Sequence, residues 1–265
     1  MLFSQDIQSQ NLGFIDQDAS VLELSVAQHD FEIRQSPTVL KSTRSGGTTG
    51  AVVWKVTPHF AAWLASPSNV FFQKGVLGSS SVVLELGSGI AGIIPAMLYP
   101  MIAHYIATDQ VYALKLLKEN IASNRSVIST NKRSKKAMST PLSERIDVLS
   151  LDWETDDVES FLKSHNVAEG VDMIIACDCI YNYALIQPFV QTCVATCSLR
   201  STSPDMKPTV CIIAQQLRQP DVFEEWLDVF SQSYRVWRLP DNLLTPPLRE
   251  GSGFVVHVGI LRNKP

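Results

Sequence analysis

VVLELGSGIAG, residues 82–92, joins a short apolar run to three glycines in Gly-x-Gly-x-x-Gly spacing. The spacing predicts a strand, a tight turn and a helix whose N-terminal N–H groups face a ligand. A dinucleotide and S-adenosylmethionine both suit such a turn, and a turn that serves packing alone is a third interpretation. Evidence for one of these three interpretations has to come from the residues around the stretch.

Strands and helices alternate along the chain on both sides of this stretch. The strands are expected at residues 81–86, 104–109, 145–153, 171–178, 208–216, 234–240 and 253–262. The helices are expected at residues 51–66, 91–98, 110–124, 155–165, 182–198 and 221–230, the last with Asp221 as its N-cap. Because no helix separates the last two strands, we expect an α/β fold with a seven-stranded, mostly parallel sheet and one antiparallel strand.

The composition fits a globular protein with a large core. Hydrophobic residues make up 45% of the 265 residues and the net charge is −4, which argues against dedicated nucleic-acid binding. Residues 1–10 carry no secretory signal, and Pro95, Pro100 and His104 interrupt the most apolar stretch, residues 90–108, so no membrane span is expected. We expect a cytoplasmic monomer, with a nuclear location also open.

Two segments and the cysteines need separate interpretations. Residues 1–45 are expected to form an N-terminal extension with a small strand pair, which leaves residues 46–265 as the main domain. Residues 125–143 carry basic side chains among serines and threonines, which is typical of a solvated, mobile loop, although a nuclear-import signal or a contact with RNA also fits. The cysteines predict buried, reduced thiols, since Cys193 and Cys197 lack the further ligands that a metal site needs.

Two acidic residues near the glycine turn favour one ligand over the other. Asp109 ends the second strand, about twenty residues after the turn, where a carboxylate can bind both ribose hydroxyls of either ligand. Glu85 lies two residues before the first glycine. A carboxylate there repels a pyrophosphate and attracts an ammonium, so the sequence favours S-adenosylmethionine over NAD.

Polar and aromatic residues also follow the third and fourth strands, at the edge where open α/β sheets bind ligands. Trp153 follows the third strand, and it either stacks on an adenine or belongs to the core. Asp178 and Tyr181 follow the fourth strand, and Asp178 is alternatively a cap of the next helix. Trp54 is interpreted as a site residue or as packing.

Together these motifs resemble the seven-β-strand protein-lysine methyltransferases of family 16, and most closely their fungal ribosomal lysine N-methyltransferase 5 group. The resemblance covers residues 46–262 and is carried by GTTGAVVWKVTPHFAAWL (47–64), VLELGSGIAGIIP (83–95), ATDQ (107–110), LDWE (151–154) and DCIYNYALIQPF (178–189). The Asp-x-x-Tyr sequence with Trp54 upstream is specific to this family, whereas many folds share the glycine turn.

The resemblance implies a Rossmann-like, S-adenosylmethionine-dependent enzyme that methylates a lysine of a large-subunit ribosomal protein, without a metal. It implies cofactor contacts from Trp54, Gly87, Ser88, Gly89, Asp109, Trp153 and Cys177. It places Asp178 and Tyr181 beside the acceptor lysine. Cys177 departs from relatives that have alanine or methionine there, and residues 1–45 match the family poorly.

Methyl transfer from a sulfonium to an amine depends mainly on alignment. The acceptor lysine, with an ordinary pKa of about 10.4, must first lose a proton, and burial in an aromatic-walled channel lowers that pKa. Because a carboxylate opposes this shift, we expect Asp178 to dock and orient the ammonium, Tyr181 to align the amine, and water to take the proton. The rival functions are methylation of another protein or of a nucleic acid, and NAD-dependent oxidoreduction.

Overall fold

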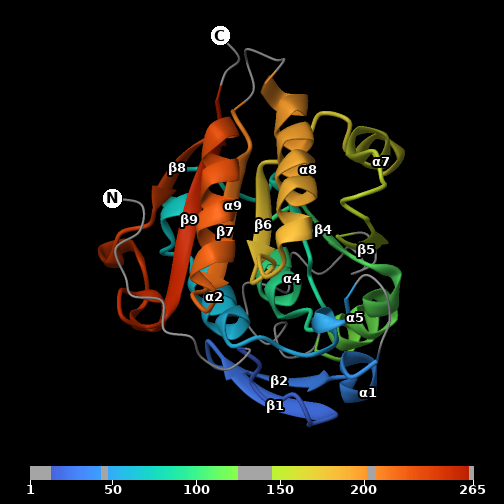
Figure 1. The fold of residues 1–265 in the computed structure, drawn as a ribbon. Coiled ribbons are helices and arrows are strands. Elements are labelled where there is room, and N and C mark those ends of the chain that lie inside the picture. The colour runs from blue at the N-terminus through green and yellow to red at the C-terminus, as the bar shows by residue number, and fades with distance from the viewer. Residues whose placement is uncertain (1–12, 43–46, 125–144, 202–206, 263–265) are drawn as a thin grey trace.

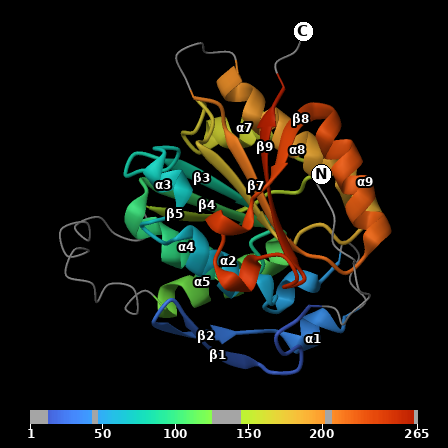
Figure 2. The same cartoon turned by 90° about the vertical axis from the view of Figure 1, so that its left-hand side faces the viewer.

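The computed structural model describes residues 13–42, 47–124, 145–201 and 207–262. A twisted seven-stranded sheet forms the centre of the molecule, helices cover both of its faces, and a separate strand pair lies along one end (Figures 1 and 2). The basic stretch 125–143 lies outside the described residues.

The large sheet has the strand order β5-β4-β3-β6-β7-β9-β8. Its strands are β3 (Val82–Leu86), β4 (His104–Asp109), β5 (Ile146–Ser150), β6 (Met173–Cys177), β7 (Val210–Gln216), β8 (Tyr234–Arg238) and β9 (Phe254–Leu261). The first five strands in this spatial order are parallel, whereas β9 is antiparallel to both of its neighbours, β7 and β8. The mostly parallel sheet with one antiparallel strand is therefore confirmed.

The helices divide between the two faces of this sheet. One face carries α2 (Val56–Leu64), α3 (Val70–Gln73), α4 (Ile93–Leu98) and α5 (Val111–Ser123), and the other carries α7 (Val158–Ser164), α8 (Tyr183–Ser201) and α9 (Pro220–Ser233). Successive strand residues face opposite sides, so Tyr105 and Ala107 of β4 pack into the first core and Ile106 into the second. Among the described residues, no helix combines the length and the apolar character needed to cross a membrane.

One helix boundary differs from the sequence prediction. Gln219 is the N-cap of α9, and Pro220 and Asp221 lie in its first turn, so the prediction of Asp221 as N-cap is wrong. Proline suits the first position of a helix because its fixed φ is helical and no N–H partner is needed there. The proline therefore starts the helix one residue before the acidic side chain.

The N-terminal strand pair is fastened to the main core. It consists of β1 (Val21–Val26) and β2 (His29–Arg34), which are antiparallel and precede the short helix α1 (Pro37–Leu40). Phe31 and Ile33 are buried in the same core as α2 and α5. Asn120 of α5 and Asn124, the C-cap of this helix, each donate one hydrogen bond to the backbone of β2 and accept one from it, all at 2.9 Å. These two amides pair with β2 as a neighbouring strand would.

Candidate functional site

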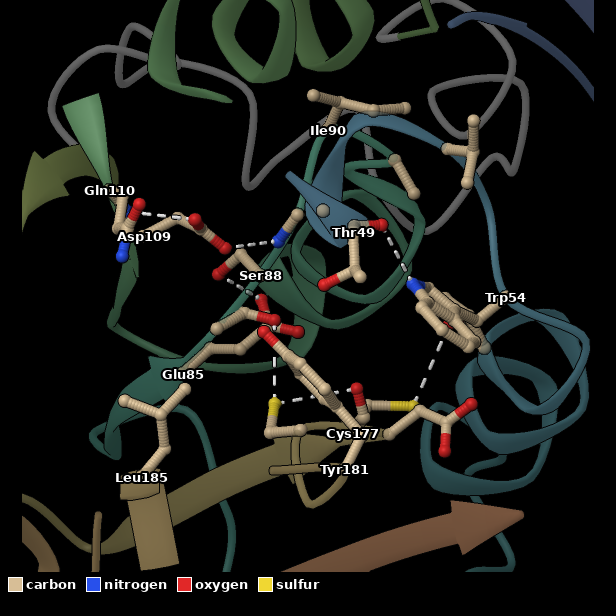
Figure 3. Close-up of a pocket in the computed structure, with 18 of the residues that line it drawn as sticks. Thr49, Trp54, Glu85, Ser88, Ile90, Asp109, Gln110, Cys177, Tyr181 and Leu185 are labelled. Atoms are coloured by element: carbon tan, nitrogen blue, oxygen red, sulfur yellow. Dashed lines mark hydrogen bonds between the residues drawn. The ribbon is translucent and has the colours of Figure 1, made fainter. Parts of the chain in front are cut away.

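A cleft of about 890 Å³, open to solvent, lies at the carboxyl ends of β3, β4, β5 and β6 (Figure 3). The loops after these strands and the short helix η1 (Thr49–Ala51) form its wall. The wall contains every candidate site residue from the sequence: Trp54, Gly87, Ser88, Gly89, Asp109, Trp153, Cys177, Asp178 and Tyr181. The fold thus brings together segments that are far apart in the chain.

The glycine turn packs against β4 and η1. The N–H of Gly89 donates to Asp109 Oδ2 at 2.7 Å, and the N–H of Ile90 donates to the carbonyl of Gly50 at 3.0 Å. Gly89 has a φ of 57°, and a Cβ at this position would lie 3.2 Å from the Gly50 oxygen. A side chain here would strain the backbone and push η1 away from the turn.

Two carboxyl groups, Glu85 and Asp109, reach the cleft from the ends of β3 and β4. Glu85 is 1% exposed and accepts hydrogen bonds from Ser88 Oγ at 2.8 Å and Tyr105 Oη at 2.9 Å. Burial raises the pKa of Glu85 to about 7, although both hydrogen bonds lower it. Burial likewise raises the pKa of Asp109 to about 6, against two backbone N–H donors. Both groups are therefore poised to ionise when a cation or a hydroxyl donor binds.

Two tryptophans line the cleft on different sides. The indole N–H of Trp54 donates to the carbonyl of Thr49 at 3.2 Å (Figure 3). Trp153 meets Phe189 edge-on, with ring centroids 5.3 Å apart, and its ring lies 3.4 Å from where a Cβ of Gly87 would be. Trp153 therefore packs on the core and lies against the glycine turn, and its stacking on an adenine stays a prediction.

The thiols at the end of β6 are buried. Cys177 Sγ lies 3.7 Å from Thr57 Oγ1 of α2. Cys179, which the sequence did not single out, lies in the cleft wall and donates its thiol to the carbonyl of Leu86 at 3.1 Å. Burial raises the pKa of both thiols well above the usual range, so both are protonated at neutral pH.

Asp178 follows β6 in an uncommon backbone conformation, with a φ of 59°. Its carboxylate accepts hydrogen bonds from the N–H of Gln216 at 3.2 Å and from Arg218 Nη1 at 2.9 Å, and its side chain is 0% exposed. Burial raises the pKa of Asp178, while the Arg218 guanidinium lowers it. Asn182, not Asp178, accepts the N–H of Ala184 at the start of α8, so the alternative of Asp178 as helix cap is wrong.

Tyr181 extends across the cleft from the loop before α8 (Figure 3). Its side chain is partly buried, and burial raises the pKa of its hydroxyl while a hydrogen bond with Thr49 lowers it. The hydroxyl is therefore a neutral hydrogen-bonding group inside the cleft.

Arg218 is the main functional candidate that the sequence interpretation missed. It lies two residues after β7, at the same sheet edge as Asp178, and this position was the signal that could have found it. Its guanidinium carbon lies 4.5 Å from the ring centre of Trp54. Gly50 and Tyr112 were also missed, and the N–H of Gly50 donates to Tyr112 Oη at 3.1 Å.

Comparisons with known proteins agree with this arrangement. A family model described as lysine methyltransferase matches residues 34–221. Ribosomal lysine N-methyltransferase 5 of Vanderwaltozyma polyspora is 29% identical over 96% of this chain and 92% of that protein. The protein of the same name from Lachancea thermotolerans is 31% identical over 82% of this chain and 81% of that protein. A structure from Streptococcus mutans, assigned as a SAM-dependent methyltransferase, superposes with a TM-score of 0.52 at 10% identity, over 91% of this chain and 56% of that chain. At this identity the last likeness shows the fold alone.

Proposed function

The chain belongs to the lysine methyltransferase family, and on that premise we propose that its substrate is a lysine of a large-subunit ribosomal protein. The reaction class, transfer of a methyl group to a protein lysine, and the methyl donor, S-adenosylmethionine, follow from the family. The choice of substrate is supported by two relatives named ribosomal lysine N-methyltransferase 5, each covered over most of its length.

The observation that carries this function is the pairing of a carboxylate-lined cofactor side with an Asp-x-x-Tyr acceptor side in one cleft. The carboxyl groups of Glu85 and Asp109 match the ammonium and the ribose hydroxyls of S-adenosylmethionine. The carboxyl group of Glu85 next to the glycine turn disfavours an anionic pyrophosphate and therefore NAD.

The assignment of individual contacts is part of the proposal. The cofactor side consists of Trp54, Gly87, Ser88, Gly89, Asp109, Trp153 and Cys177, all in the cleft wall. In this arrangement Asp109 accepts the ribose hydroxyls and Trp153 stacks on the adenine edge. Asp178 and Tyr181 form the acceptor side, where the lysine amine enters.

When bound, S-adenosylmethionine supplies a methyl group on a positively charged sulfur. The chain itself has to align the acceptor amine and let it lose its proton. The amine, with an ordinary pKa of about 10.4, is deprotonated more easily when the surrounding side chains exclude water. In this proposal Tyr181, which lines the cleft, aligns the amine through its hydroxyl, and water takes the proton.

The proposal also covers the oligomeric state, the location in the cell and the division of the chain into domains. We propose that the enzyme acts as a monomer, in the cytoplasm and also in the nucleus. Residues 1–45 are an extension that accompanies a methyltransferase domain of residues 46–265.

The test uses the purified protein, labelled S-adenosylmethionine and separated large and small ribosomal subunits. We expect label on a lysine of one large-subunit protein, identified by mass spectrometry. An Asp109→Ala variant, which loses the ribose contact, provides the background. Label in RNA, in small-subunit proteins alone or in a non-ribosomal protein contradicts the proposed substrate.

A further inference from the structure

Asp178 is already neutralised inside the protein. Arg218 Nη1 lies 2.9 Å from Asp178 Oδ2, and only 6% of the arginine side chain and none of the aspartate side chain is exposed. The second oxygen accepts the N–H of Gln216. A carboxylate with both oxygens engaged and a guanidinium beside it has little attraction left for a lysine ammonium.

The ion pair also fixes the backbone that leads to Tyr181. Asp178 adopts the left-handed region with a φ of 59°, which non-glycine residues rarely enter. Its N–H donates to the carbonyl of Ala214 at 2.8 Å, and its carboxylate is held by Gln216 and Arg218. Three bonds to β7 and the residues after it therefore hold the strained turn in place.

Arg218 contacts the cofactor side as well. Its guanidinium lies over the ring of Trp54, and Phe14 packs on the same indole with ring centroids 4.5 Å apart. Gly13 fits closely against Arg218, because a Cβ on this glycine would lie 2.9 Å from Arg218 Nη1 and 2.3 Å from Gln216 Oε1. Gly13 and Phe14 precede the region that the family model matches, so the N-terminal extension completes this contact.

We propose that Arg218 is a positioning residue for methyl transfer, which holds the Asp178 turn and Trp54 in one arrangement. In this arrangement Asp178 contributes to methyl transfer only through its ion pair with Arg218. Its carboxylate does not bind the acceptor ammonium. A free carboxylate beside the amine would hold its proton in place, and Arg218 removes that opposition. This inference rests on the proposed function, since it concerns the acceptor side of the same cleft.

The central test compares Arg218→Met, Arg218→Lys and Asp178→Asn with the wild type. We expect Arg218→Met to lower kcat/KM about 100-fold, because a small misplacement of the reacting groups is enough for such a loss. Arg218→Lys keeps the charge without the planar stack and should lose about tenfold. If Asp178 docks the ammonium directly, removing Arg218 frees the carboxylate and KM for the acceptor falls, which overturns the proposal.

A double variant separates the two roles further. With Asp178 acting through Arg218, Asp178→Asn combined with Arg218→Met should be no more than about threefold slower than Arg218→Met alone. A direct role for Asp178 instead predicts that the two losses multiply. The pair Arg218→Lys and Asp178→Asn gives the same comparison if Arg218→Met does not fold.

The chain offers a control in a second arginine–aspartate pair, whose side chains are 9% and 23% exposed. Arg200 Nη1 of α8 lies 2.7 Å from Asp172 Oδ1, before β6 and therefore at the opposite end of the sheet from the cleft. Arg200→Met should lower the melting temperature, because it breaks a partly buried ion pair, yet leave kcat/KM within about twofold of wild type. Equal kinetic losses in the two arginine variants would reduce Arg218 to a structural role.

Cofactor affinity gives a readout that does not depend on the acceptor. Because Arg218 holds Trp54, Arg218→Met should weaken S-adenosylmethionine binding about fivefold in calorimetry, and Arg200→Met should not. If the wild type binds the cofactor but methylates no ribosomal protein, the proposed substrate fails and this measurement still decides the role of Arg218. Wild-type affinity and activity in folded Arg218→Met overturn the inference.

Discussion

Binding of S-adenosylmethionine should release protons from the two carboxyl groups of the cleft. Burial raises the pKa of Glu85 to about 7 and that of Asp109 to about 6, so Glu85 is about half protonated at pH 7 and Asp109 about half protonated at pH 6. An ammonium beside Glu85 and hydroxyl donors on Asp109 favour the ionised forms. The protein must therefore lose protons as the cofactor enters, and the affinity must rise with pH until both groups are already ionised.

The size of this effect follows from the two pKa values. At pH 6 Glu85 holds about 0.9 proton and Asp109 about 0.5, so complete ionisation releases about 1.4 protons per cofactor. At pH 8 the same groups release about 0.1 proton. The α-amino group of the ligand, with an ordinary pKa of about 7.7–8.0, stays protonated at pH 6 and does not disturb the count there.

Calorimetry at pH 6 in two buffers with different ionisation enthalpies measures this release directly. Glu85→Gln keeps an acceptor oxygen for Ser88 or Tyr105 but carries no titrating proton, so its release should fall to about 0.5 proton. The remaining release of about 0.5 proton comes from Asp109. Release below about 0.2 proton by the wild type at pH 6, with binding intact, would refute the idea that the cofactor ionises these carboxyl groups.

The same raised pKa makes the cofactor-free protein less stable as pH rises. The folded state holds the Glu85 proton up to about pH 7, whereas the unfolded state releases it near its ordinary value of 4.5. The free energy of unfolding should therefore fall by about 3 kcal/mol between these pH values on account of Glu85, and Glu85→Gln should remove this part of the slope. Urea unfolding titrations between pH 4.5 and 7 on the wild type and on Glu85→Gln measure this pH dependence.

Three further changes test other parts of the site. Asp109→Ala should weaken S-adenosylmethionine binding about 100-fold in calorimetry, since two hydrogen bonds to a charged group are lost, and an affinity close to wild type would exclude the ribose contact. Gly89→Ala should lower the free energy of unfolding in urea by about 1–2 kcal/mol, because its φ is positive and Gly50 lies against it. Cys193, Cys197 and Cys211 are buried and free away from the cleft, so a thiol reagent should modify these three in the native protein only as fast as it unfolds, and their prompt reaction would contradict this burial.

The sequence was sufficient for the order of the elements because their patterns are local. The strand expected at residues 104–109 matches β4 at both ends, and the near-continuous apolar run before Asp178 forms a strand buried along its whole length. The clustering of Asp109, Trp153 and Asp178 was also predictable, since the carboxyl ends of parallel strands share one edge of the sheet.

The contacts that were missed are those that depend on tertiary packing. Arg218 and Asp178 are forty residues apart, and only the pairing of β6 with β7 brings their side chains together. Asn120 and Asn124 follow Leu117 by three and seven residues and share its buried side, but only the fold shows that they bond the backbone of β2. The periodicity of a sequence shows which face of a helix or strand a residue occupies, but it does not show which residue of another element bonds to it.

The two sides of the cleft differ in whether a cation of the protein is already paired with their carboxyl groups. Glu85 and Asp109 have raised pKa values and hydrogen-bond partners that are neutral, so a cationic ligand is what completes their environment. Asp178 already has its cation in Arg218. A cofactor that carries positive charge gains from the first arrangement, whereas an amine that must give up a proton gains from the second, because a compensated carboxylate does not raise the pKa of the amine. One cleft can thus attract a cation on one side and favour a neutral nucleophile on the other, and replacement of Arg218 removes that difference.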